Sequence, residues 1–141
     1  MRRALVIGTG GHCRVILSLL ADTKEHEVIG VIEIGTPRKN EIIMGIPVVG
    51  LGPDVGSYSK YTDLDVFLSI GDNTERKDWL KKVRILNLST PNLISPFAII
   101  DLSVQMGEAN IVCGNAFIGP EAILMDNNLI NTAAVIEHEV K

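Results

Sequence analysis

Cysteine and histidine are scarce in this sequence of 141 residues, which holds two cysteines and three histidines. Cys13 and Cys113 lie a hundred positions apart and match no metal-ligand spacing. We therefore expect two buried free thiols in a reducing compartment, and neither a disulfide nor a metal site. The sequence also lacks any face-sized run of Lys or Arg and carries a net charge of −4, which disfavours a nucleic-acid partner.

Long apolar runs are absent as well. No stretch approaches the length of a membrane-spanning helix, so we expect no membrane partner. The apolar run at residues 4–7, after Arg2 and Arg3, is too short for the core of a signal peptide and breaks at once into glycines. These absences predict a soluble, cytoplasmic protein. Hydrophobic residues make up 46% of the chain and charged residues 21%, a balance that predicts a packed globular core.

The first half of the chain alternates between predicted strands and helices. Apolar strands are predicted at residues 5–7, 28–32 and 66–70, with a short edge-type segment at 45–49 after a polar loop that contains Pro37, Arg38, Lys39 and Asn40. A first helix is predicted after the glycines that follow the first strand, because apolar residues recur there at helical spacing. A second helix is predicted from about Thr74 to Val83, with Asp72 or Asn73 as its N-cap. Strands that alternate with amphipathic helices predict a small parallel α/β unit covered on both faces.

From Ile94 onward only a period of six residues fits the sequence. The aliphatic positions are Ile94, Ile100, Met106, Val112, Ile118, Leu124, Ile130 and Ile136. Residues of small or modest size recur four positions after each of them, where we expect the chain to turn. This pattern predicts a β-helix with three flat faces, in which each aliphatic residue points to the axis, and it disfavours an ordinary β-sandwich, whose strands alternate with a period of two.

Five segments together give the chain a resemblance to a known family. They are IGTGGH at residues 7–12, GIPVVG at 45–50, SIGDN at 69–73 with Arg76, LISP at 93–96 and NTAAVIEHE at 131–139. In their order and spacing the chain resembles the bacterial sugar acyltransferases that include sialic-acid O-acetyltransferases and UDP-amino-sugar N-acetyltransferases. The resemblance implies a Rossmann-like domain at residues 1–92, a left-handed parallel β-helix at residues 93–141, a homotrimer, and acetyl-CoA as the acetyl donor.

His138 is the candidate catalytic base. It lies two positions after Ile136 on the outside of the predicted coil, and transfer of an acetyl group to an amine or hydroxyl needs a base that titrates near neutral pH. Glu139 matches the family's residue that orients this histidine, and Glu137 is the second choice. The sequence alone leaves open that His138 is a solvated surface histidine beside two acids.

The glycine loop after the first strand is the candidate substrate site. Backbone N–H groups of Gly8, Gly10 and Gly11 can approach a phosphate or a sugar at the start of the following helix, although a plain tight turn would look the same. The resemblance favours nucleotide-sugar binding here. The complete set of expected substrate-binding residues is Gly8, Gly10, Gly11, His12, Glu33, Ile70, Gly71, Asp72 and Asn73.

Three positions depart from the family pattern. Ile34 stands where the UDP-sugar-binding relatives tend to have a second acid after Glu33, which weakens the expectation that Glu33 binds a ribose. Ser95 replaces the histidine of an Ile-His-Pro segment, and Phe97 replaces a small residue. The glycine loop also departs from the dinucleotide-binding pattern, because Cys13 stands at its third glycine, which disfavours a dinucleotide-dependent oxidoreductase.

Two functions remain open from the sequence. The first is an acetyltransferase, or its N-terminal portion, that acts on a sugar or nucleotide-sugar in the synthesis of bacterial surface glycans. The second is a non-catalytic module that binds a nucleotide-sugar and mediates assembly. Because fewer than three full coils follow Ile94, we expect a truncated or shortened member of the family, with little or no acetyl transfer by these 141 residues.

Overall fold

The computed structural model describes residues 1–37 and 41–141. These fall into two compact units, Met1–Thr90 and Pro91–Lys141. Arg38, Lys39 and Asn40 of the expected polar loop lie outside the described residues. Within the described ranges, none of the helices combines the length and the apolar character that crossing a bilayer requires.

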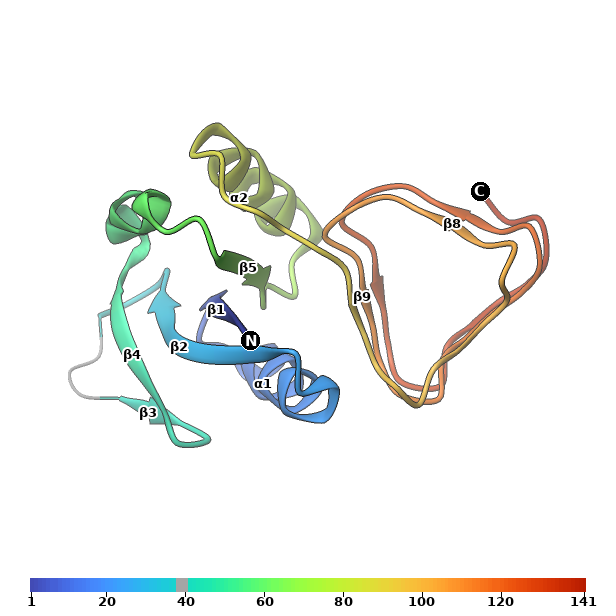
Figure 1. Cartoon of the computed structure of the whole chain (residues 1–141), viewed down its shortest axis with the longest axis horizontal. Helices are drawn as coiled ribbons and strands as arrows, with labels where there is room; N and C mark the ends of the chain where they lie inside the picture. The colour runs from blue at the N-terminus through green and yellow to red at the C-terminus, as the bar shows by residue number, and fades with distance from the viewer. Residues whose placement is uncertain (38–40) are drawn as a thin grey trace. The chain divides into compact units, whose positions relative to one another are not determined.

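The first unit is built on a five-stranded sheet with the order β3-β4-β2-β1-β5 (Figure 1). The strands are β1 (Arg2–Ile7), β2 (His26–Glu33), β3 (Ile42–Ile43), β4 (Ile46–Leu51) and β5 (Leu64–Leu68). Neighbours from β4 through β2 and β1 to β5 are parallel, so their carboxyl ends share one edge of the sheet. The residues at the end of β1 and all of β5 are buried, which explains why both read as continuous apolar runs.

Helices cover both faces of this sheet. The helix α1 (Gly11–Thr23) lies on one face, and the 3₁₀-helix η1 (Gly52–Lys60) and the helix α2 (Asn73–Ile85) lie on the other (Figure 1). α1 buries a stripe that includes Ile16 and Leu20, and α2 buries Leu80 and Val83. The predicted α/β unit is therefore present, with α2 two residues longer at its end than the sequence indicated.

The sequence analysis was wrong about one edge of the sheet. The segment expected at the edge forms β4, whose outer side is covered by β3 in an antiparallel pair. The two strands are joined by Met44 and Gly45, both with positive φ of 48° and 81°, the backbone of a tight hairpin turn. A two-residue strand has too few residues to show a period. The 3₁₀-helix η1 was missed because it buries only Val55 and so shows no helical repeat of apolar residues.

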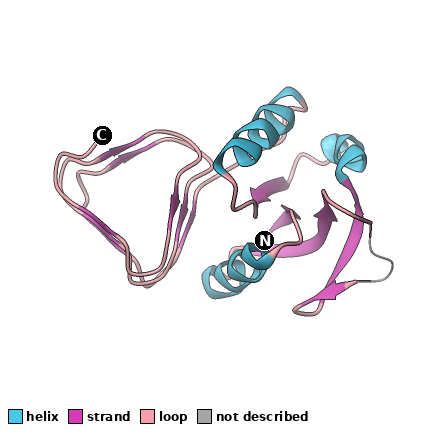
Figure 2. Cartoon of the chain, turned by 180° about the vertical axis from the view of Figure 1, so that it is seen from behind, coloured by secondary structure: helices cyan, strands magenta, loops and turns pink. Residues whose placement is uncertain are grey.

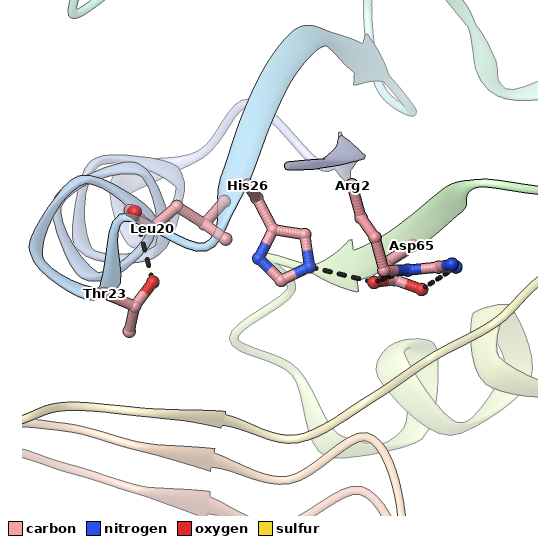
Figure 3. Close-up of polar contacts among 5 residues, drawn as sticks. All are labelled: Arg2, Leu20, Thr23, His26 and Asp65. Carbon is pink, nitrogen blue, oxygen red and sulfur yellow. Dashed lines mark hydrogen bonds and ion pairs between the residues drawn. The ribbon is translucent and has the colours of Figure 1, made fainter.

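A polar cluster joins β1, β2 and β5 at their amino ends (Figure 3). Both carboxylate oxygens of Asp65 accept hydrogen bonds from the guanidinium of Arg2, each at 2.8 Å, and Oδ2 lies 2.8 Å from Nε2 of His26. Burial raises the pKa of Asp65, but hydrogen bonds from Arg2, His26 and Ser89 outweigh it and lower the pKa to about 2. The cluster therefore holds an ionised carboxylate between three strands.

The second unit is a three-sided coil of short parallel strands (Figure 2). The strands are β6 (Leu93–Ile94), β7 (Ile99–Ile100), β8 (Gln105–Met106), β9 (Ile111–Val112), β10 (Phe117–Ile118), β11 (Ile123–Leu124), β12 (Leu129–Ile130) and β13 (Val135–Ile136). They form the sheets β13-β10-β7, β11-β8 and β12-β9-β6, one on each face. Val112, Ile118 and Leu124 pack together in the core with the other aliphatic positions of the repeat, as the period of six predicted.

The corners of the coil differ in detail from the expectation. The left-handed backbone conformation recurs three positions after each of the six aliphatic anchors from Met106 to Ile136, at Ala109, Asn115, Glu121, Asn127, Ala133 and Glu139. The residue of small or modest size comes one position later, and at Ala116 and Ala122 it is fully buried inside the coil. The small residues are therefore required by the narrow corner of the core, not by the turn itself.

Candidate functional site

A cleft of about 370 Å³ opens at the carboxyl ends of β1, β2 and β5. We call it the glycine-loop cleft. Of the residues expected from sequence, it is lined by Gly8, Gly10, Glu33, Ile70 and Gly71. Its other lining residues, which were not among the expected substrate-binding residues, are Thr9, Ile34, Gly35, Thr36, Ser69 and Glu75. Three segments far apart in the chain thus meet at the edge where parallel α/β sheets bind ligands.

The glycine loop begins at Gly8, where the backbone conformation favours glycine. Gly8 has φ +108°, and a Cβ added there would lie 2.8 Å from the carbonyl oxygen of Ser69. Gly10 is the N-cap of α1 and offers no side-chain acceptor to the helix, whose first turn carries no acidic residue. The amino end of α1 therefore leaves backbone N–H groups and a favourable potential for an anionic ligand.

Glu33 connects the glycine loop to the turn that follows β2. The hydroxyl of Thr9 donates to Oε2 of Glu33, and the backbone N–H of Gly35 donates to Oε1 at 2.7 Å. Glu33 is only 5% exposed. Both oxygens of this carboxylate are engaged within the chain, so Glu33 shapes the wall of the cleft. That it also accepts from a ribose hydroxyl stays a prediction.

His12, Gly11, Asp72 and Asn73 do not line the cleft, although they lie in the two segments that frame it. His12 is half-buried, and burial together with the positive charge of Arg76 lowers its pKa, which favours the neutral imidazole. Asp72 caps α2 by accepting from the N–H of Glu75 at 2.8 Å.

The buried Arg76 fixes the loop after β5. Its guanidinium donates to the carbonyl oxygen of Ile70 at 3.0 Å and to Oδ1 of Asn73 at 2.8 Å. These contacts hold the backbone of the cleft wall in place. The role of Asn73 visible in the structure is therefore to position the loop from outside the cleft.

In the second unit, His138 and Glu139 form a pair at the corner that follows β13. Nδ1 of His138 lies 3.1 Å from Oε2 of Glu139, and the side chains are 68% and 66% exposed. Glu139 takes the left-handed conformation, with φ 59°, and its N–H donates to the carbonyl oxygen of Pro120 at 2.9 Å. That corner turns the carboxylate back toward the imidazole, so Glu139 is the acid that the structure brings to His138.

The preceding coil packs closely against the backbone of His138 at Gly119. A Cβ on Gly119 would lie 2.8 Å from the backbone nitrogen of His138, so the chain can stack this closely only over glycine. Glu139 also borders a groove of about 600 Å³ on the outside of the coil, lined in addition by Ser103, Gln105, Glu121, Ile123 and Lys141. A small acceptor could therefore reach the pair from solvent. Among the described residues, no three His, Cys, Asp or Glu side chains are grouped to hold a metal ion.

Comparison with known proteins identifies the family of the first unit. Residues 3–83, more than half of the chain, match the family described as the PglD N-terminal domain. The chain belongs to this family. No curated protein sequence is significantly similar to it.

Solved structures resemble the chain over both units. It is similar to GDP-perosamine N-acetyltransferase from Caulobacter crescentus, in the structure of a histidine mutant in complex with CoA and GDP-perosamine. The two are 30% identical, with a TM-score of 0.87, over 96% of this chain and 62% of that one. It is also similar to the acetyltransferase domain of PglB from Neisseria gonorrhoeae in complex with acetyl coenzyme A, with 26% identity and a TM-score of 0.86 over 98% of this chain and 65% of that one. The chain therefore spans less than two thirds of the length of either relative.

A third similarity concerns the fold alone. WeeI from Acinetobacter baumannii is 14% identical, with a TM-score of 0.75 over 97% of this chain and 73% of that one. Together these structures confirm the resemblance to bacterial sugar acetyltransferases and the predicted fold class, a Rossmann-like unit followed by the first coils of a left-handed parallel β-helix.

Proposed function

We propose that the protein is an acetyltransferase that moves the acetyl group of acetyl-CoA to an amine or hydroxyl of a nucleotide-linked sugar. The observation that carries the proposal is the His138–Glu139 pair, with 3.1 Å between Nδ1 and Oε2, in a chain similar to sugar acetyltransferases that were solved with CoA or acetyl coenzyme A. The glycine-loop cleft gives the same chain a place for an anionic acceptor.

In this proposal the first unit binds the nucleotide part of the acceptor. The N–H groups at the amino end of α1 face the phosphates, since no side-chain acceptor from Gly10 occupies them. Glu33, held by Thr9 and Gly35, gives the cleft a fixed wall. A preformed wall loses little conformational entropy when the ligand binds.

His138 acts as the general base of the proposed reaction. If Nδ1 donates its proton to Glu139, Nε2 is left as the acceptor for a proton from the attacking amine or hydroxyl. The new bond forms between that nitrogen or oxygen and the acetyl carbon, the bond from that carbon to sulfur breaks, and the proton held by His138 passes to the leaving thiolate. Glu139 fixes the tautomer and stabilises the imidazolium that forms in between.

We propose that copies of the chain associate, as the homotrimer expected from the resemblance. Ile99, Phe117 and Val135 stand side by side on the outer face of the sheet β13-β10-β7, in register on three successive coils. They are 65%, 37% and 61% exposed. An exposed apolar stripe of this kind favours contact with another copy. Phe117→Asp should reduce the mass measured by sedimentation to that of one chain, and an unchanged mass would count against this surface.

The binding half of the proposal is tested by calorimetry with UDP, GDP and CMP. Saturable binding that weakens in Gly10→Asp, which places a negative charge at the amino end of α1, supports nucleotide binding at the glycine loop. Absence of binding by every nucleotide would remove the nucleotide-sugar acceptor and leave a free sugar as the substrate to test.

The acetyl-transfer part of the proposal is tested on the protein in the form that its host produces, by following release of the CoA thiol. His138→Ala should lower kcat by about 10²–10⁴-fold, the range of a general base. Glu139→Gln should lower it strongly, and the matched control Glu137→Gln should leave it nearly unchanged. Nucleotide binding without any transfer would instead favour the non-catalytic binding module.

A further inference from the structure

The His138–Glu139 pair lies on the surface of the β-helix, where side-chain packing does little to fix its geometry. The two side chains are 68% and 66% exposed. A general base nevertheless has to stay within hydrogen-bond reach of its substrate and of the acid that orients it. The 3.1 Å between Nδ1 and Oε2 therefore depends on the backbone that carries the pair.

The preceding coil holds this backbone on both sides of His138. Before the histidine, the N–H of Gly119 donates to the carbonyl oxygen of Ile136 at 2.8 Å. After it, the carbonyl oxygen of Pro120 accepts from the N–H of Glu139 at 2.9 Å. Two successive residues of one coil thus fix the segment of the next coil that contains the base and its acid.

Gly119 lets the two coils meet in direct backbone contact at this point. A Cβ there would lie 2.8 Å from the nitrogen of His138, 3.1 Å from the carbonyl carbon of Glu137 and 3.3 Å from Cα of His138. All three are backbone atoms, so no side-chain rotation could relieve the contact. Gly119 does not have a positive φ, so its own conformation is open to other residues. Glycine is needed here because of the segment that carries the base.

The repeat itself does not require glycine at this position. Gly107 and Gly119 are two of the eight residues that directly follow an aliphatic anchor, and the other six have a side chain. A Cβ on Gly107 would lie 2.8 Å from the carbonyl oxygen and 2.9 Å from the carbonyl carbon of Met125, and it would also touch the flexible end of Asp126. The contact is of the same kind, but the segment that it supports carries no histidine. Gly107 is therefore a matched reference for Gly119.

We propose that Gly119 is a positioning residue for the base. By letting the coils meet at the backbone it sets the height of His138 on the coil. Together with Pro120 it also sets the place of the Glu139 carboxylate that orients the imidazole. This inference rests on the role proposed for His138, and it extends that role to a residue that acts only through the backbone of the base.

The test compares Gly119→Ala with Gly107→Ala in the protein in the form that its host produces. Both variants press a methyl group against the backbone of the next coil, so both should unfold at lower denaturant concentration. Only Gly119→Ala should lower kcat, by about 10–100-fold, because a small misplacement of a catalytic group is costly. The KM of both substrates should stay within about twofold of the wild type, since only an interaction of the transition state is lost.

Two further readouts separate positioning of the base from a general loosening of the coil. Adding Gly119→Ala to His138→Ala should lower kcat no further, because the group that it displaces is already absent. The ¹⁵N resonances of the imidazole should show one predominant tautomer in the wild type, with the proton on Nδ1 facing Glu139. Gly119→Ala should mix the two tautomers, and Gly107→Ala should not.

The outcomes that overturn the inference differ from those that overturn the proposed function. A wild-type kcat and tautomer in Gly119→Ala would show that Gly119 does not position the base, while the proposed function stands. An equal loss of kcat in Gly107→Ala, or a further loss in the His138→Ala background, would assign the effect to the stability of the coil. If the wild type transfers no acetyl group, the proposed function fails, and the tautomer comparison still decides whether Gly119 positions the imidazole.

A measurement on the wild type covers the case in which Gly119→Ala does not fold. The amides of Gly119 and Glu139 both donate from one coil to the other, so hydrogen exchange should be slower at both than in an unstructured chain by at least about tenfold. Exchange of the Glu139 amide at the unstructured rate would show that the preceding coil does not hold this segment, and the inference would fail.

Discussion

Thr9 and Glu33 are joined by a hydrogen bond from the threonine hydroxyl to the carboxylate, although they are 24 positions apart in the sequence. Thr9 lies in the loop after β1, and Glu33 is the last residue of β2. The same carboxylate accepts from the N–H of Gly35 at 2.7 Å. Glu33 thereby ties the glycine loop to the turn that follows β2, and the shape of the glycine-loop cleft depends on this contact.

Thr9→Val tests that dependence, because valine keeps the shape of threonine and loses the donor. We expect a loss of about 1–3 kcal/mol in the free energy of unfolding, the usual effect of a hydrogen bond to a charged group, together with weaker nucleotide binding. Glu33→Gln should have a similar effect, and the double variant should lose less than the sum of the two, as measured by denaturant unfolding and calorimetry.

A direct ribose contact by Glu33 would give another pattern. Glu33→Gln would then weaken binding of GDP but not of its 2′-deoxy form, while Thr9→Val would bind both as the wild type does. Additive losses in the double variant would show that the two side chains act separately and would contradict the coupling.

The repeats and the glycine loop were predictable from sequence because each depends on a local rule. An aliphatic residue at every sixth position follows from a coil with three faces, and Ile118 and Val112 are fully buried as that rule requires. The glycine loop follows a strand and opens a helix, and φ +108° at Gly8 explains why glycine stands there.

The parts that escaped prediction depend on contacts between distant segments. Nothing near Glu33 in the sequence indicates that Thr9 donates to it. The exposed apolar stripe of Ile99, Phe117 and Val135 was missed because the period of six identifies only the inward residue of each strand. It says nothing about the residue type of the outward neighbour, such as Phe117. These features are decided by packing, which a sequence pattern does not encode.

Gly8→Ala should be strongly destabilising, whereas Gly11→Ala should not. At Gly8 the added methyl group would lie 2.8 Å from Ser69 O and 2.9 Å from its Oγ, in a backbone with φ +108°, so we expect a loss of about 2–4 kcal/mol. At Gly11 the methyl would meet no atom within 4 Å, and alanine favours the helix, so stability should be unchanged or rise by up to about 1 kcal/mol. Equal losses in urea unfolding would contradict this account of the loop.

Acid should weaken the first unit through Asp65. Its pKa lies at about 2 in the folded chain, below the ordinary value of 3.8, so the folded state gains stability above the ordinary pKa and loses it as the pH falls toward 2. The loss should be about 2 kcal/mol between pH 4 and pH 2. Asp65→Asn should lower stability at pH 7 and flatten this part of the profile.

Asp63→Asn is the control for that measurement. Asp63 pairs with Arg3 at 3.6 Å, but both side chains are largely exposed, at 50% and 41%, and such pairs contribute under about 1 kcal/mol. The variant should keep the wild-type profile between pH 4 and pH 2. A flattened profile in Asp63→Asn, or an unchanged one in Asp65→Asn, would show that the acid sensitivity arises at another group.

Asn110 should be the most sensitive polar position of the β-helix. It is fully buried, its Oδ1 accepts from the backbone N–H of Asn128 at 2.8 Å, and its Nδ2 donates to the carbonyl oxygen of Met125 at 2.8 Å. Its own N–H donates to Oδ1 of Asn92 at 2.8 Å, so the three asparagines form a ladder with one rung per coil. Asn110→Ala leaves the N–H of Asn128 and the carbonyl oxygen of Met125 without these part-buried hydrogen bonds and removes a buried side chain, at a cost of about 1–3 kcal/mol.

Hydrogen exchange locates this loss within the ladder. In Asn110→Ala the amide of Asn128 should exchange faster, because it loses its acceptor, while amides of the first unit keep their rates. Asn131→Ala is the matched control, since Asn131 is exposed and its substitution should change stability by less than about 0.5 kcal/mol. If Asn128 stays protected in Asn110→Ala, the coils are held in register by the backbone ladders and the aliphatic core, and the asparagines only fill the corner.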